Sequence, residues 1–211
     1  MLLSALAALS EARRAELARV VAASEFVGSV LIQDPAALEW FARHEAPGGA
    51  RSANADYESR AGQAASTNEA QRILREWRYR EMLRIAWRDI AGRDIAGRDI
   101  AGRGNAGGVG AGVVETLHEL SDFADASIRA AVAAAQLHLQ EVFGRPRDAG
   151  GNEAVLIVLG MGKLGGRELN FSSDIDLIFL FSEGGQTDGP RVAENEEYFN
   201  RLGREIGIEI I

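Results

Sequence analysis

An apolar run that ends in a glycine-rich loop constrains the fold of this chain more than any other feature. Residues 154–159 (AVLIVL) are all apolar and include β-branched side chains, which predicts a buried strand. Gly160–Gly166 (GMGKLGG) follows, and four of its seven residues are glycine. Glycines permit positive φ and let backbone N–H groups approach an anion closely. We therefore expect a phosphate-binding loop after the strand, to which Lys163, the only lysine of the chain, adds a positive charge.

A pair of aspartates follows this loop at strand spacing. Residues 172–181 (SSDIDLIFLF) predict a second strand. Because side chains alternate between the two faces of a strand, Asp174 and Asp176 share one face. Two such carboxylates can bind one divalent cation, and hard oxygen ligands suit Mg²⁺. An isolated Asp-x-Asp usually marks a solvated turn, but two acids opening an apolar strand next to a phosphate loop favour metal-dependent phosphoryl or nucleotidyl transfer.

A dinucleotide-binding fold is the less favoured alternative. Residues 160–165 match the pattern G-x-G-x-x-G, and Glu183 lies about 20 residues further on. The segment from Gly166 to Ser173 is nevertheless short for a parallel βαβ crossover, which needs roughly ten to twelve residues. The alternative also leaves the aspartate pair without a role.

Residues 1 to about 145 show helical periodicity. Ser24 is a predicted N-cap, and Asp34-Pro35 predicts a further helix start that turns Trp40 and Phe41 toward the core. Residues 46–66 predict a mobile loop or linker, and a new helix follows Asn68. One face of that helix is basic, and is either a solvated surface or, alternatively, a stripe that binds phosphate or a partner. Its basic residues are Arg72, Arg75, Arg78, Arg80 and Arg84.

The second half of the helical region contains a tandem repeat. The pentapeptide RDIAG at 88–92 recurs at 93–97 and 98–102, and its period fits neither a helix nor a strand, so we expect a surface loop. Helical pattern resumes at 113–120, and Ser121 and Asp122 are predicted caps of a helix over 123–143. The polar segment 147–152 is a predicted hinge. It divides a helical region, 1–150, from the start of a catalytic core, 151–211.

Composition excludes several classes of function. The net charge of −8 argues against broad electrostatic binding to nucleic acid or to a membrane surface. The chain has no cysteine, which excludes disulfides and thiolate metal sites and suits the cytoplasm. No run of about 18 apolar residues predicts a transmembrane helix. His44, His118 and His138 have no partner at metal-ligand spacing.

The block at residues 160–179 resembles the signature of the bifunctional glutamine synthetase adenylyltransferase/adenylyl-removing enzymes, which belong to the DNA-polymerase-beta-like nucleotidyltransferase superfamily. The block is long and highly specific. Residues 80–89 (REMLRIAWRD) resemble the family helix that precedes the catalytic core, and residues 24–27 with Asp34-Pro35 are similar to its N-terminal helices. The resemblance implies an α+β fold, with a mainly helical N-terminal region before an incomplete nucleotidyltransferase-type α/β core.

The resemblance also implies an activity, and the block is most similar to the N-terminal half of these enzymes. That half removes AMP from a tyrosine of glutamine synthetase by phosphorolysis, which releases ADP and regulates nitrogen assimilation. The implied partners are glutamine synthetase, the PII signalling protein, ADP or ATP, and phosphate. Asp174 and Asp176 would hold Mg²⁺ and be the catalytic residues. The phosphate- or nucleotide-binding candidates are Gly165, Gly166, Lys163 and Ser173. Lys163 could instead pair with Glu168. Ser172 or Ser173 could either contact phosphate or shape the turn.

The C-terminal end departs from the family pattern. After the helix that contains residues 198–204, the family continues to a strand with a third metal-binding aspartate. This chain ends instead with residues 206–211 (IGIEII). We expect this tail to leave the helix early, and we interpret the chain as truncated. An inactive or purely partner-binding fragment is therefore the alternative to the enzyme.

Overall fold

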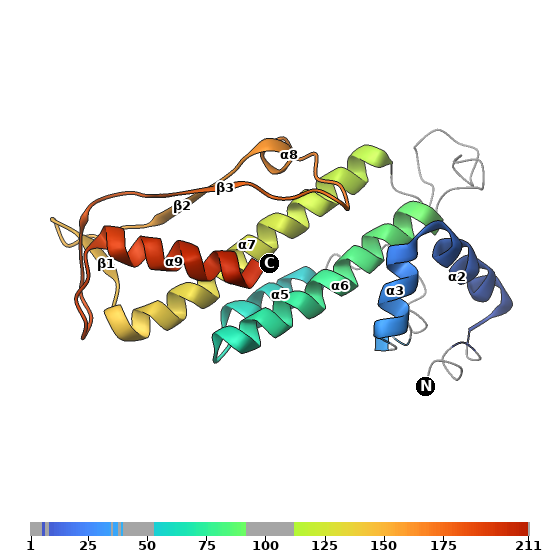
Figure 1. The fold of residues 1–211 in the computed structure, drawn as a ribbon, viewed down its shortest axis with the longest axis horizontal. Coiled ribbons are helices and arrows are strands. Elements are labelled where there is room, and N and C mark those ends of the chain that lie inside the picture. The colour runs from blue at the N-terminus through green and yellow to red at the C-terminus, as the bar shows by residue number, and fades with distance from the viewer. Residues whose placement is uncertain are drawn as a thin grey trace. The chain divides into compact units, whose positions relative to one another are not determined.

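The computed structural model describes residues 6, 9–34, 36, 37, 39, 53–91 and 112–210 (Figure 1). The fold is mainly helical with two small sheets, which confirms the predicted α+β class. The elements in chain order are α2 (Glu11–Ala23), α3 (Glu25–Gln33), α5 (Ala53–Gly62), α6 (Thr67–Ala91), α7 (Val113–Phe143), β1 (Pro146–Asp148), β2 (Leu156–Gly160), α8 (Gly162–Gly165), β3 (Leu177–Phe181), β4 (Gly185–Thr187) and α9 (Asn195–Ile210).

The chain divides into two compact units. One comprises residues 1–51 and 78–120, and the other comprises residues 52–77 and 121–211. The division falls inside α6 and inside α7, so each of these helices contributes to both units. The compositional boundary predicted at residues 147–152 stays a prediction.

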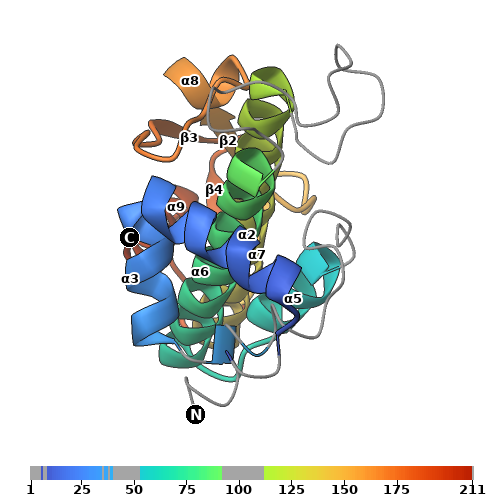
Figure 2. The same cartoon turned by 90° about the vertical axis from the view of Figure 1, so that its right-hand side faces the viewer.

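The first unit is built on α2 and α3, which lie next to one another (Figure 2). The Ser24 side chain accepts a hydrogen bond from Val27 N, which confirms it as the N-cap of α3. Asp34 Oδ1 accepts from Ala36 N at 3.0 Å, as expected of a helix start there. Trp40 and Phe41 lie outside the described residues. The core of this unit contains Val20, Val27, Val30, Leu31, Leu83 and Trp87.

The second unit begins with a helix where the sequence predicted a loop. Residues 53–62 form α5, so the predicted loop at 46–66 is wrong over this part, while 46–52 lie outside the described residues. Tyr57 stacks on Trp77 with ring centroids 6.0 Å apart, and Ala61 is fully buried. α5 is therefore held in place by one aromatic ring and by small side chains. Such residues produce little apolar periodicity in the sequence, which is why the helix was not predicted. Residues 88–91 of the pentapeptide repeat continue α6 and Arg88 is buried, so the predicted surface loop is wrong for them, while 92–102 lie outside the described part.

α7 is one continuous helix of 31 residues. The predicted break at residues 121–122 is wrong, because both side chains make tertiary contacts from within the helix. Ser121 is fully buried and its Oγ accepts a hydrogen bond from Leu169 N, while Asp122 pairs with Arg167. The helix ends at Phe143 as predicted, and Gly144 follows with φ 72°.

The two sheets are both antiparallel pairs. β2 pairs with β3 in the register Leu156↔Phe181 to Gly160↔Leu177, and β1 pairs with β4. A dinucleotide-binding fold requires parallel strands here, so that alternative is wrong. The predicted hinge at 147–152 overlaps β1 and an ordered turn, in which Asp148 Oδ1 accepts from Gly150 N and Asn152 N.

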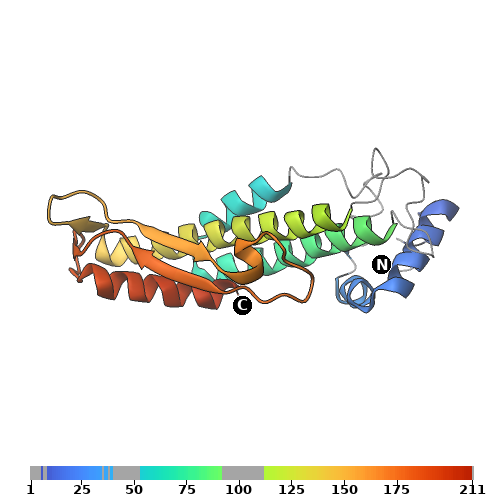
Figure 3. The same cartoon turned by 90° about the horizontal axis from the view of Figure 1, so that it is seen from above.

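The β2–β3 hairpin lies over α7 and α9 (Figure 3). Phe181 stacks on Phe199 of α9 at 5.1 Å, and Phe143 of α7 meets Tyr198 of α9 edge to face at 6.4 Å. Only one face of the hairpin is covered, so β2 is half-buried and not the fully buried strand predicted. α9 continues to Ile210, and the expected early end of that helix is wrong because Ile206 is fully buried.

The basic face predicted on α6 is not continuous. Arg84 is buried and bonded to Glu81, so it does not belong to the surface. Arg72 lies within ion-pair distance of Glu69 and Glu76 on its own helix. Among the described residues, no helix is both long enough and apolar enough to cross a lipid bilayer.

Candidate functional site

The glycine-rich loop and the aspartate pair meet at one end of the β2–β3 hairpin (Figure 1). Met161 N donates to Asp176 O at 2.9 Å, which extends the strand pairing one step beyond Gly160 and Leu177. A Cβ on Gly162 would lie 3.8 Å from Asp176 Oδ2, so this carboxylate sits beside the start of α8. The hairpin therefore brings together the two motifs that the sequence separates.

Asp174 and Asp176 precede β3, which begins only at Leu177, so the predicted strand at 172–181 is too long. Side-chain burial nevertheless alternates between half-buried and exposed from Ser173 to Leu180, as in an extended chain. Both aspartates are exposed, while Ile175 between them is half-buried. The two carboxylates thus lie on the same solvent-facing side, as their spacing predicts.

The amides of Gly165 and Gly166 take part in the loop's own hydrogen bonds. Gly165 N donates to Met161 O at 3.2 Å and Gly166 N donates to Gly162 O at 3.0 Å. A Cβ on Gly165 would lie only 2.5 Å from Gly160 O, so backbone crowding requires a glycine there. Their direct contact with phosphate stays a prediction.

Three neighbouring amides are better placed as donors. Within the described part of the chain, the N–H groups of Gly162, Lys163 and Leu164 have no acceptor. Gly162 has φ 53°, and Leu164 is buried and anchors α8. The sequence pattern indicated a loop of this kind, but the pairing of individual amides depends on the folded turn.

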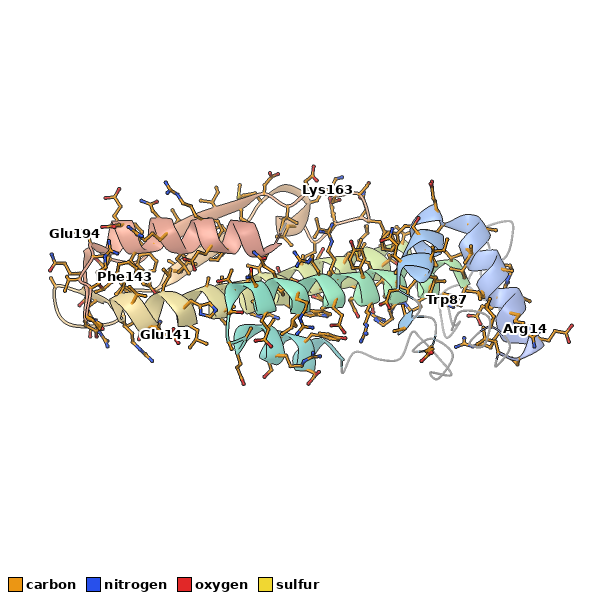
Figure 4. All side chains as sticks on the ribbon, turned by 60° about the horizontal axis from the view of Figure 1, so that its bottom comes forward. Arg14, Trp87, Glu141, Phe143, Lys163 and Glu194 are labelled. Atoms are coloured by element: carbon orange, nitrogen blue, oxygen red, sulfur yellow. The ribbon has the colours of Figure 1, made fainter. Side chains whose placement is uncertain are left out.

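Lys163 lies across the loop from Ser173. Its Nζ is 3.5 Å from Ser173 Oγ, and Figure 4 shows Lys163 on the loop at the end of the hairpin. The alternative partner, Glu168, contacts it instead through the backbone, where Glu168 N donates to Lys163 O at 2.7 Å. The Lys163 side chain is exposed, so its ammonium group can reach a bound anion.

Asn170 organises the turn before the aspartates and was not singled out by the sequence. Its Oδ1 accepts hydrogen bonds from Ser172 N and Ser172 Oγ, both at 3.1 Å, and from Ser173 Oγ at 2.9 Å. Asn170 N in turn donates to Ser173 Oγ at 3.0 Å. These bonds favour the turn-shaping interpretation of the two serines. The signal was available, since an Asn side chain often bonds the backbone two residues on.

The carboxylates of Asp174 and Asp176 provide some, but not all, of the ligands that a hard cation needs. Exposed carboxylates at 174 and 176 offer the oxygen ligands that Mg²⁺ prefers, and Mg²⁺ ordinarily keeps waters and substrate phosphates in its shell. Within the described ranges, no group of three or more histidine, cysteine or acidic side chains is arranged to hold a metal. A cation bound here would therefore take two ligands from this pair, and substrate and solvent would supply the others.

Comparison with known proteins decides the family. The sequence model of the glutamate-ammonia ligase adenylyltransferase family matches residues 14–210, which includes the whole loop and both aspartates. The chain belongs to this family. The family description names nucleotidyl transfer as the chemistry, and glutamine synthetase is the protein on which the relatives act by name.

Three relatives illustrate the similarity, each named a bifunctional glutamine synthetase adenylyltransferase/adenylyl-removing enzyme. The protein of Thioalkalivibrio sulfidiphilus is 46% identical over 145 residues, covering 68% of this chain and 13% of the relative. That of Pseudomonas putida is 41% identical over 211 residues (95% and 19%), and that of Pseudomonas aeruginosa is 39% identical over 212 (97% and 20%). This chain therefore spans a fifth or less of the length of these relatives.

Proposed function

We propose that this member of the adenylyltransferase family removes AMP from adenylylated glutamine synthetase by phosphorolysis, with ADP as the product. The observation that supports the proposal most is the position of the Asp176 carboxylate beside the glycine-rich loop, on the same solvent-facing side as Asp174. Metal-binding carboxylates next to phosphate-binding amides are what nucleotidyl transfer requires. The N-terminal-type block at residues 169–176 favours the removing reaction over the adding one.

In this proposal the aspartates bind the metal ion and the glycine-rich loop binds the phosphate groups. Asp174 and Asp176 would hold Mg²⁺, which when bound neutralises negative charge on the phosphates. The amides of Gly162, Lys163 and Leu164, with the Lys163 ammonium group, bind phosphate oxygens. Inorganic phosphate attacks the phosphorus of tyrosine-bound AMP, the P–O bond to tyrosine breaks, and the leaving phenolate takes up a proton. No covalent enzyme intermediate is needed, so catalysis rests on positioning and electrostatics.

The exposure of the site suits a protein substrate. Both aspartates and Lys163 face solvent at the end of a hairpin, where an AMP group attached to the surface of another protein can reach them. We propose glutamine synthetase as that protein, PII as the regulator, and the cytoplasm as the location. Phosphate, ADP and ATP are the small-molecule partners.

The experiment compares the chain with its Asp174→Asn, Asp176→Asn double variant. The readout is phosphate- and Mg²⁺-dependent ADP release from adenylylated glutamine synthetase. We expect the double variant to lose activity by about 100-fold or more, because the charge-neutralising site is lost. Glu183→Gln is the matched control, since Glu183 is exposed beyond the other end of β3 and should leave the rate unchanged.

A second candidate function is partner binding without catalysis. It is favoured by the arrangement of the described acidic side chains, which offers a metal two carboxylates and no third. Binding to glutamine synthetase that is equally strong in wild type and double variant, without ADP release by either, would support this second function and reject the first.

A further inference from the structure

The loop that bears the site residues is held against α7 by two side chains of that helix. Ser121 is fully buried, and its Oγ accepts a hydrogen bond from Leu169 N at 3.4 Å. Asp122, the next residue, accepts a hydrogen bond through Oδ1 from Arg167 Nη2 at 2.5 Å. Leu169 is itself buried. The chain between α8 and the aspartates is therefore anchored to α7 at two residues, Arg167 and Leu169.

Arg167 has an unusual backbone conformation. Its φ is 57°, and among the described residues it is the one non-glycine residue with positive φ. The left-handed conformation is common directly after a helix end, and here Arg167 N donates to Leu164 O at 3.0 Å and Glu168 N donates to Lys163 O at 2.7 Å, which is the Schellman pattern at the end of α8. The side chain adds a tether to α7, because Nη2 bonds to Asp122 and Nη1 lies 3.9 Å from Asp125 Oδ2.

The direction that the chain takes at Arg167 determines where the aspartates lie. From Arg167 the chain reaches buried Leu169, then the turn organised by Asn170, and then Asp174 and Asp176. The other end of this segment is tied to the loop by Met161 N donating to Asp176 O. The segment is therefore held near its start by Arg167 and Leu169 and at its end by Asp176.

We propose that Asp122 is a positioning residue of this site: through Arg167 it holds the 167–176 segment so that the two aspartates face the glycine-rich loop. The metal-binding part of this inference rests on the proposed function, while the tether itself does not.

The contribution to global stability should be small. The Arg167 and Asp122 side chains are 46% and 47% exposed, and exposed ion pairs contribute little to the free energy of unfolding. Local order of the loop should respond much more, because a loop with few buried side chains opens without global unfolding. This separation distinguishes positioning from a general structural role.

The test uses Asp122→Asn in the full chain, with Glu197→Gln as the matched control. Glu197 is about as exposed as Asp122 and pairs with Arg201 within α9 at 2.7 Å. Hydrogen–deuterium exchange is measured over residues 166–176, and Mn²⁺ affinity is measured by electron paramagnetic resonance as a probe of the carboxylate pair. We expect Asp122→Asn to speed exchange in this segment and to weaken Mn²⁺ binding by about tenfold. The control should do neither, and Asp122→Glu should restore both.

The outcomes separate this inference from the proposed function. Unchanged exchange in Asp122→Asn overturns the tether, and faster exchange with unchanged Mn²⁺ affinity overturns the positioning role. If the wild-type chain binds no Mn²⁺, the metal site of the proposed function fails, and exchange alone decides the tether. Arg167→Gly adds a further check, because glycine relieves the positive φ but loses the ion pair. A segment as ordered in Arg167→Gly as in wild type would contradict the inference.

Discussion

Gly165 illustrates how one missing side chain lets the candidate site fold. It lies where a Cβ would be 2.5 Å from Gly160 O, whereas the nearest atom to a Cβ on Gly166 is Gly162 O at 3.5 Å. The two glycines are adjacent in the same loop and both donate backbone hydrogen bonds within it. The fold therefore requires a glycine at 165, where a Cβ would collide with backbone, but leaves room for a Cβ at 166.

We expect Gly165→Ala to lower the free energy of unfolding by about 1–3 kcal/mol, because the added methyl group must displace backbone. Gly166→Ala should cost less than about 1 kcal/mol, since its contacts are at ordinary van der Waals distance. Urea unfolding of the two variants measures the difference. Equal losses would show that crowding at Gly160 O is not what requires the glycine.

The parts of α6 and α7 that belong to the first unit meet at a buried cluster of four charges. Glu81 and Arg84 of α6 bond to one another, and Glu119 of α7 bonds to both Arg84 and Arg88. All four side chains are less than 10% exposed. Burial by itself lowers the pKa of Arg84, but the carboxylates of Glu81 and Glu119 outweigh it and the pKa is raised.

Removing one carboxylate from this cluster should be costly. We expect Glu119→Gln to destabilise the chain by about 3–5 kcal/mol, because two buried guanidinium groups lose a shared counter-charge. Glu115→Gln is the control, since Glu115 is an exposed residue of the same helix. Thermal unfolding followed by circular dichroism compares them. Matching midpoints for the two variants would contradict the prediction.

The surface of the second unit includes an apolar area on the uncovered face of the hairpin. Its residues are 42–47% exposed and alternate with those that face the helices. They are Ile157, Leu159, Ile178 and Leu180. Contiguous apolar surface of this kind is unusual on a folded protein and binds apolar dyes.

We expect the folded chain to bind an apolar fluorescent dye, and the Ile178→Thr, Leu180→Thr double variant to lose most of the signal. Val192→Thr is the control, since Val192 is 60% exposed but lies outside β2 and β3. Fluorescence titration under native conditions measures both. A double variant that binds as much dye as the wild type would place the binding surface elsewhere.

Local patterns in the sequence were sufficient for the parts of the fold that depend on neighbouring residues. Strand alternation placed Asp174 and Asp176 on one side, and the short segment after Gly166 argued correctly against a parallel crossover. The N-cap at Ser24 and the helix end at Phe143 also follow from local chemistry. The block at residues 160–179 pointed to the family for the same reason, since its residues are contiguous.

Only the tertiary structure decided which of these local possibilities are used. Ser121 has the side chain of a helix cap, but a hydrogen bond from Leu169, 48 residues away, uses it inside α7. α5 packs on α6 through the stacking of Tyr57 on Trp77, and the loop after α8 is tied to α7 because Asp122 accepts a hydrogen bond from the Arg167 side chain. Periodicity and capping rules describe interactions within a few residues. Contacts between distant segments are fixed only when the whole chain packs, and those contacts build the support of the candidate site.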